Sequence, residues 1–180
     1  LPFSASGGES AVSADRKYIK WIDFKVTSAA MRDALKADET TYGTERHISW
    51  VEILAYLAAK NGGNFKGYKS SQTQKLIDAV KNGETVQTLA KNLKNFNYYL
   101  EAYAAVLGGL VGKYTEVTVA PDGSETRTEK YGLRAFSPIA AGYYYNHYDD
   151  FGDSRSFGYR RNHLGHDLIG SIGTPIIAVE

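Results

Sequence analysis

Hydrophobic residues recur at three- and four-residue spacing through much of residues 16–113, a pattern typical of helices that bury one face against their neighbours. The clearest start signal is Ser49-Trp50-Val51-Glu52, a capping box in which the serine and glutamate side chains accept hydrogen bonds from exposed backbone N–H groups. This helix is predicted to run over residues 50–60 and to end at Gly62-Gly63. Other helices are predicted to begin at Ser71 and Thr85 and to cover residues 98–110, 28–35 and 18–24.

A β-hairpin is predicted to follow the helices. Residues 114–119 alternate β-forming side chains, Pro121-Asp122-Gly123 favours a turn, and residues 126–131 form the returning strand. The threonine-rich, acidic faces of both strands favour exposure over burial. After Gly132 the composition shifts toward proline, glycine and tyrosine, so we place a domain boundary near residue 134. Four segments result: a small, polar lead-in over 1–15, a helical domain over 16–113, a hairpin connector over 114–133, and a further domain over 134–180.

Composition narrows the classes of protein to which the chain can belong. It has 180 residues, of which 43% are hydrophobic, enough to bury a core in one or two domains. Lys and Arg number 21 against 20 Asp and Glu, so the basic excess of nucleic-acid-binding proteins is missing and we expect no nucleic-acid partner. No apolar run approaches the roughly 18 residues of a membrane span. The lack of cysteine excludes disulfides and cysteine metal ligands.

The last part of the chain contains a recognisable motif. His163, Gly165 and Asp167 form the pattern H-x-G-x-D, which is followed by Gly173-Thr174-Pro175-Ile176-Ile177-Ala178-Val179. This pattern resembles the first metal-binding motif of the lysostaphin/LytM-type zinc metallopeptidases, which cut peptidoglycan peptides. The resemblance implies that His163 and Asp167 are zinc ligands. In the family a second motif, H-x-H, supplies the third ligand and a catalytic histidine, and no H-x-H occurs in this sequence.

The helical pattern and the resemblance together predict an α+β chain, in which an N-terminal helical bundle precedes the start of a β-rich LytM-type peptidase domain over residues 134–180. Catalytic zinc generally takes three protein ligands and keeps a fourth position for water. The metal lowers the pKa of that water to about 7 and polarises the scissile carbonyl. Two ligands are too few for such a site, so a third group must come from elsewhere in the chain, from a partner chain or from residues beyond these 180. The resemblance assigns no catalytic base within these residues.

Residues before the motif are candidates for substrate binding. Phe151-Gly152 and Arg155 resemble the aromatic-Gly-x-x-Arg run that leads into the family's histidine. Tyr145 and Tyr148 carry aromatic rings that can stack on sugars or line a peptide cleft, although each could equally be a core residue of a strand. We predict Tyr145, Tyr148 and Arg155 as substrate-binding residues.

Several other polar residues invite a metal-binding interpretation. His163-x-x-His166 has plausible ligand spacing, but the resemblance puts His166 at a variable position, and a pocket-wall or surface role is the alternative. His163 itself would be an ordinary loop histidine if H-x-x-x-D stood alone. His147 lies in an aromatic run typical of packed residues, and His47 precedes a helix start. The spacing of Asp149, Asp150 and Asp153 differs from an EF-hand loop and favours a solvated turn, with an oxygen-ligand site for a hard cation as the alternative.

The helical region has a second, fainter resemblance. Residues 53–65, which end in Lys60-Asn61-Gly62-Gly63-Asn64-Phe65, are similar to the lysozyme-like transglycosylase pattern, in which a helix ends in E-S-G-G-N-F. The family's glutamate is a general acid, and Lys60 stands in its place. Lysine, with a pKa of about 10.4, is a poor substitute for that acid, and Glu52 lies near the other end of the helix. The region is thus either a degenerate sugar-binding domain or a generic helical bundle.

These observations lead to a functional hypothesis with two alternatives. The parent protein is predicted to be a zinc endopeptidase that acts on peptidoglycan peptides, extracellular or at the surface of a Gram-positive bacterium. The first alternative is a non-catalytic scaffold or wall-binding protein, as are many LytM-like domains of division and sporulation assemblies. The second is glycan binding through the helical domain. The chain begins at Leu1 with no visible signal peptide, which is compatible with a processed terminus and a parent protein that is membrane-anchored.

The strands of residues 135–180 are expected to leave open edges. Such edges favour disorder or pairing with another chain. We therefore predict that this segment is either poorly ordered or completed by an intermolecular contact, with self-association through the open edges as one form of that contact.

Overall fold

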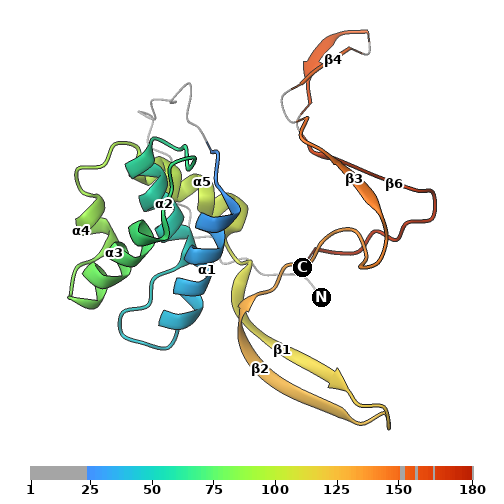
Figure 1. Ribbon diagram of the computed structural model, residues 1–180, viewed down its shortest axis with the longest axis horizontal. Coiled ribbons are helices and arrows are strands. Elements are labelled where there is room, and N and C mark those ends of the chain that lie inside the picture. Colours follow the sequence, from blue (N-terminus) through green and yellow to red (C-terminus); the bar gives the residue numbers. More distant parts are fainter. Residues whose placement is uncertain (1–23, 151–152, 157, 164, 180) are drawn as a thin grey trace, which may run out of the picture.

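The computed structural model describes residues 24–150, 153–156, 158–163 and 165–179. Helices occupy the first part of this chain and strands the second, which confirms the α+β class (Figure 1). The predicted lead-in over 1–15, and the helix predicted over 18–24 except for Phe24, lie outside the described residues. The elements are α1 Ser28–Thr41, α2 Trp50–Asn61, α3 Ser70–Lys81, α4 Val86–Ala90, α5 Phe96–Leu107, β1 Val111–Val119, β2 Glu125–Leu133, β3 Tyr145–Tyr148, β4 Ser154–Ser156, β5 Arg160–Asn162 and β6 Asp167–Gly170.

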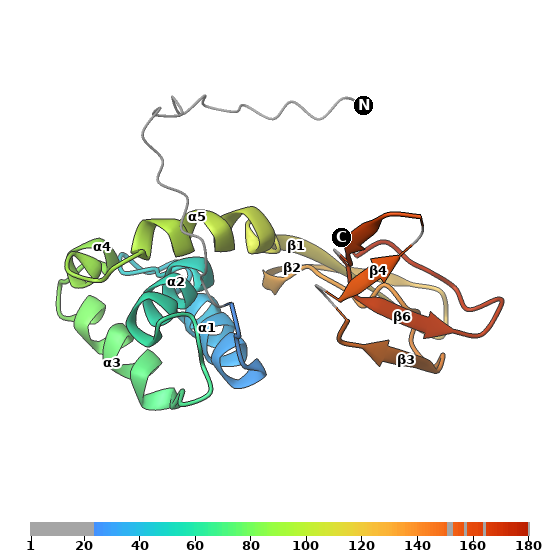
Figure 2. The same ribbon diagram turned by 90° about the horizontal axis from the view of Figure 1, so that it is seen from above.

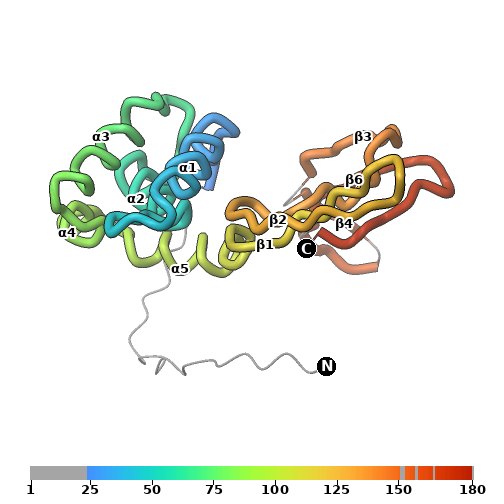
Figure 3. The backbone as a smooth tube through the Cα atoms, turned by 90° about the horizontal axis from the view of Figure 1, so that it is seen from below, coloured from blue at the N-terminus to red at the C-terminus, as the bar shows by residue number. Residues whose placement is uncertain are grey.

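The helices share one hydrophobic core, with α2 as its central element. This helix contacts each of the other four, and Figures 2 and 3 show the helices gathered into one body. Its side chains Ile53, Leu54 and Leu57 are fully buried, and each such residue contributes about 1.5–3 kcal/mol through removal of apolar surface from water. None of the helices that the structure describes combines the length and the apolar character that crossing a membrane would require.

Local signals set the ends of α2 as the sequence predicts. The Ser49 side chain accepts a hydrogen bond from Glu52 N–H at 3.2 Å, and the Glu52 carboxylate accepts one from Ser49 N–H at 3.3 Å. The helix stops at Gly62, whose φ of 63° lies in the left-handed region that favours glycine. The predicted capping box and glycine stop are therefore confirmed.

Other helix boundaries differ from the prediction. α1 continues to Thr41 instead of ending near residue 35, because Ala37, Asp38 and Thr41 are buried against the rest of the core. The helix that starts after Thr85 has only five residues. α5 spans Phe96–Leu107 and not residues 98–110, since its buried side chains include Phe96.

The predicted hairpin is present, and one of its tyrosines fixes it to the helices. β1 and β2 pair antiparallel from Val111 opposite Leu133 to Val119 opposite Glu125, and most of their side chains are exposed, as expected. The Tyr131 hydroxyl donates to Asp38 Oδ1 at 2.8 Å, and the Tyr131 ring stacks on Tyr42 with centroids 3.5 Å apart.

Residues 134–179 form short strands with little hydrophobic interior. β3 pairs with β6 and β4 with β5, each pair antiparallel, so every described strand of this segment has a free edge. The end of the chain returns to its beginning, because Phe136 N–H donates to Val179 O at 2.8 Å and Ile139 bridges to Ile176. Ile139 is the one buried hydrophobic residue in the described part of this segment. Open edges were expected here, whereas self-association stays a prediction.

Candidate metal centre

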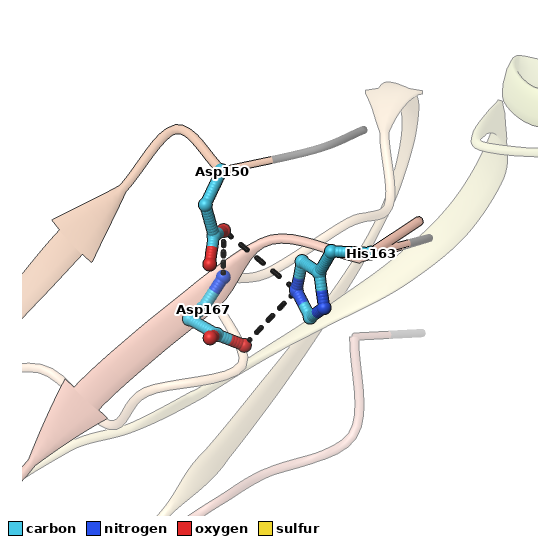
Figure 4. Close-up of side chains that lie close together, drawn as sticks. All are labelled: Asp150, His163 and Asp167. Carbon is cyan, nitrogen blue, oxygen red and sulfur yellow. Dashed lines mark hydrogen bonds and ion pairs between the residues drawn. The ribbon is translucent and has the colours of Figure 1, made fainter. Parts of the chain in front are cut away.

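Three side chains from separate parts of the strand region converge on one point. Asp150 lies just after β3, His163 directly follows β5, and Asp167 is the first residue of β6. Figure 4 shows both carboxylates pointing toward the imidazole ring of His163. Each of these residues can supply one ligand atom such that the three atoms lie within 4.8 Å of one another.

Backbone pairing brings the three residues together. In the β3–β6 ladder Tyr148 is the partner of Asp167, which places the start of β6 close to Asp150, two residues after Tyr148. Asp153 N–H donates a hydrogen bond to Asp150 O at 3.1 Å. Asp153 O in turn accepts from His163 N–H at 2.8 Å, at the end of the β4–β5 ladder. The convergence therefore depends on the hydrogen bonds of two ladders and on the backbone hydrogen bonds of Asp153.

The distances place His163 Nε2 between the two carboxylates. It lies 3.2 Å from Asp167 Oδ1 and 3.7 Å from Asp150 Oδ1. Nε2 is buried, yet it makes no hydrogen bond to any residue that the structure describes. A buried polar nitrogen without a hydrogen bond costs free energy. We therefore expect this nitrogen to have a further binding partner.

Arg155, on β4, connects the two carboxylates on their other side. Its Nη2 donates to Asp150 Oδ2 and, at 2.9 Å, to Asp167 Oδ2. Asp150 Oδ1 also accepts a hydrogen bond from Asp167 N–H at 3.2 Å. The guanidinium group therefore contacts only the Oδ2 atoms, and both Oδ1 atoms remain directed at His163.

These contacts control the charge of Asp150. Removal from water would by itself raise the pKa of this carboxyl group, whereas the hydrogen bond from Asp167 N–H and the nearby His163 ring lower it. The second set of effects is larger, so the pKa of Asp150 lies below its ordinary value. Asp150 is consequently ionised at neutral pH.

The donor set fits zinc. Zinc in proteins is bound by histidine nitrogen and carboxylate oxygen, and catalytic sites use three such ligands. His163 Nε2 is the nitrogen that such an ion would take, and Asp150 and Asp167 would provide the oxygen atoms. The structure thus brings together the two predicted ligands, His163 and Asp167, and adds a carboxylate that the sequence pattern favoured as part of a solvated turn.

The predicted substrate-binding residues lie in different environments. Arg155 contacts the metal-site carboxylates. Tyr148 is the cross-strand partner of Asp167, so its exposed side chain shares a face of the sheet with the site. Tyr145 lies three positions away on β3, and alternation along a strand puts it on the opposite face.

The remaining histidines lie outside the site. His166 and His147 stack on each other with ring centroids 4.3 Å apart. His47 Nε2 contacts the buried carboxylate Asp38 Oδ1 at 2.8 Å, far along the chain in the helical region.

In the region that resembles transglycosylases, the described contacts of Lys60 and Glu52 are not those of a general acid. The Lys60 ammonium group lies 5.7 Å from the centre of the Tyr56 ring. Glu52 serves the capping box and accepts a hydrogen bond from Gln87 Nε2 at 2.9 Å. Both side chains therefore have structural contacts that account for their positions.

Comparison with known proteins yields no relative from which a function could be transferred. No protein-family model matches the chain, and neither a curated protein nor a solved structure matches it. The LytM-type resemblance accordingly remains a prediction carried by the motif residues.

Proposed function

We propose that this chain is part of a zinc endopeptidase that hydrolyses peptide bonds of bacterial peptidoglycan. The proposal includes the finer domain arrangement, in which the helical region precedes the start of a LytM-type peptidase domain over residues 134–180. The observation that carries it is the juxtaposition of His163 Nε2 and Asp167 Oδ1, 3.2 Å apart within an H-x-G-x-D motif.

Peptide hydrolysis needs groups that activate water and stabilise charge on the carbonyl oxygen. A zinc ion held by His163 and Asp167 would supply a Lewis acid for both purposes. Arg155 holds the Asp167 carboxylate in place through its Oδ2 atom, and Tyr148 presents an aromatic surface on the same side of β3–β6. These residues account for metal binding and substrate contact, and a general base would have to come from outside the cluster.

A non-catalytic wall-binding or scaffold role is the alternative. It is favoured by the lack of an H-x-H motif in these 180 residues, because the related enzymes draw a ligand and a catalytic histidine from that motif. In this alternative the cluster would bind metal or remain an ion-paired structural element. We propose an extracellular or cell-surface location in both cases, with peptidoglycan peptides or glycan strands as partners.

The test is digestion of purified Gram-positive peptidoglycan by the gene product at its native length, loaded with zinc. An endopeptidase releases fragments with new amino groups, whereas a glycosidase creates new reducing ends. We expect new amino groups with the unmodified protein and none with His163→Ala. Binding to peptidoglycan without any release of fragments would contradict the enzymatic proposal and favour the wall-binding alternative.

A further inference from the structure

Each carboxylate of the candidate metal centre directs one oxygen atom at Arg155 and the other at His163. Both Oδ2 atoms contact Arg155, and both Oδ1 atoms face His163 Nε2. Asp150 Oδ1 is further oriented by the N–H group of Asp167 at 3.2 Å. Asp150 therefore has the same relation to Arg155 and His163 as Asp167, the residue that the motif assigns as a ligand.

The spacing of these atoms suits a single metal ion. Zinc–nitrogen and zinc–oxygen bonds of about 2.0–2.1 Å in a tetrahedron put neighbouring ligand atoms roughly 3.3–3.4 Å apart. The two distances from His163 Nε2 to the carboxylate oxygens, 3.2 and 3.7 Å, lie on either side of that value. Small side-chain movements would therefore bring all three atoms to coordination distance.

Asp150 is more buried than the neighbouring acid, Asp149. The Asp150 side chain is 16% exposed and the Asp149 side chain 89%, so only Asp150 is withdrawn from solvent into the cluster. Together, two carboxylates and one guanidinium group carry one net negative charge beside the imidazole ring of His163. A divalent cation that occupied the centre would be attracted by this charge at short range.

We propose that Asp150 is a third zinc ligand, bonding through Oδ1, so that this chain holds a His/Asp/Asp metal site without an H-x-H motif. The inference rests on the proposed zinc site at His163 and Asp167 and deepens it. The fourth position is left for water or substrate, as in catalytic zinc sites.

Cobalt(II) as a zinc substitute, combined with Asp150→Cys, tests coordination at this position directly. The natural chain has no cysteine, so the introduced thiol is the only one and no other thiol contributes to the absorption. A thiolate bonded to cobalt(II) produces an intense charge-transfer absorption band in the near ultraviolet. We expect this band in Asp150→Cys at one cobalt per chain and not in Asp149→Cys, the matched control. Equal spectra for the two variants would overturn the inference.

Zinc titration supplies an independent readout that does not depend on activity. Removal of a residue that only supports a ligand weakens metal binding about 10–100-fold, so loss of a ligand should exceed ~100-fold. We expect Asp150→Asn to lose at least that much affinity, Asp149→Asn to match the unmodified chain, and Asp150→His to retain binding because imidazole is itself a zinc ligand. A carboxylate needed only for pairing with Arg155 would not be replaced by histidine.

The variants also separate failure of this inference from failure of the proposed function. If His163→Ala abolishes zinc binding while Asp150→Asn binds like the unmodified chain, Asp150 is not a ligand and the zinc site at His163 and Asp167 stands. If His163→Ala binds zinc unchanged, the site itself and the peptidase proposal fail together. Circular dichroism of each variant verifies that the fold is retained.

Discussion

In the helical region, residues 28–107, hydrophobic side chains from all five helices form one core, whereas Ile139 is the one buried hydrophobic residue in the described part of residues 134–179. The strand region instead gathers polar groups, because Asp150, Arg155 and His163 are each partly withdrawn from solvent there. Burial of apolar surface holds the first region together, whereas paired charges occupy the centre of the second and need not stabilise it. Stability of the strand region should therefore respond to a ligand of that centre.

The largest effect is expected from a cavity in the helical core. Leu54 is fully buried in α2, so Leu54→Ala should reduce the free energy of unfolding by about 2–5 kcal/mol. Val106 on α5 is 73% exposed, and Val106→Ala should change it by less than about 0.5 kcal/mol. Urea unfolding followed by helical circular dichroism measures both. Similar values for the two variants would mean that the core is not packed as described.

Zinc should stabilise the strand region alone. A ligand at 100 times its dissociation constant stabilises the structure that binds it by about 2.7 kcal/mol. Hydrogen exchange should therefore slow at the amides of β3 and β6 and remain unchanged in α2, and His163→Ala should remove the effect. Equal slowing of hydrogen exchange by zinc in both regions would contradict the claim that zinc stabilises the strand region alone.

The contact between hairpin and helices should depend on one buried carboxylate. Asp38 accepts hydrogen bonds from Trp50 N–H and the Tyr131 hydroxyl, both at 2.8 Å, and contacts His47 at the same distance. Asp38→Asn should cost about 1.5–3 kcal/mol, the range for hydrogen bonds to charged groups. The exposed side chain of Asp78 accepts a hydrogen bond from Gln74 Nε2, so Asp78→Asn is the control, with an expected change below about 0.5 kcal/mol. A control loss as large as that of Asp38→Asn would refute this role.

The smallest effect should depend on pH. The Tyr68 hydroxyl donates to Asp33 Oδ2 at 2.6 Å, and this hydrogen bond lowers the pKa of Asp33. Because the folded pKa is lowered, the stabilisation is complete above the unfolded pKa of about 3.9 and is lost as pH falls through the folded value. Burial, with a smaller effect of Asp33, raises the pKa of Tyr68 to about 12, so the contact is also lost as pH rises from about 10 through that value.

Tyr68→Phe should therefore lower the unfolding free energy by about 1 kcal/mol at neutral pH. The difference from the unmodified chain should shrink below about pH 4, where Asp33 begins to be protonated in the unfolded state. Urea unfolding across this range measures it, with Tyr98→Phe as the control. A difference that stays constant down to acidic pH would argue against the contact.

Helix ends and turns that depend on adjacent residues could be predicted from the sequence. The capping box of Ser49 and Glu52, the stop at Gly62 and the turn at Pro121-Asp122-Gly123 each depend on a few adjacent residues, and the structure has them all. The full length of α1 was not predictable in this way. Its last turn is polar in sequence and is helical because Asp38 finds partners on α2 and β2, which lie far along the chain.

The candidate site was predictable only where its residues are close together in the sequence. His163 and Asp167 lie within one short motif, so the sequence alone predicts that they act together. Asp150 joins them only because β3 pairs with β6 and β4 with β5, a pairing that no local signal encodes. The sequence offered two hints. The acidic run that contains Asp150 had an oxygen-ligand cation site as its alternative interpretation, and Arg155, predicted to bind substrate, is a cation five positions from Asp150 that contacts both carboxylates.

The most direct test of the metal centre is calorimetric titration of the chain with zinc, alongside His163→Ala. The proposed site predicts one zinc ion per chain, with binding lost in the variant, because His163 would be the only nitrogen ligand of the described cluster. Undiminished binding by His163→Ala, or no binding by the unmodified chain, would contradict the proposed site.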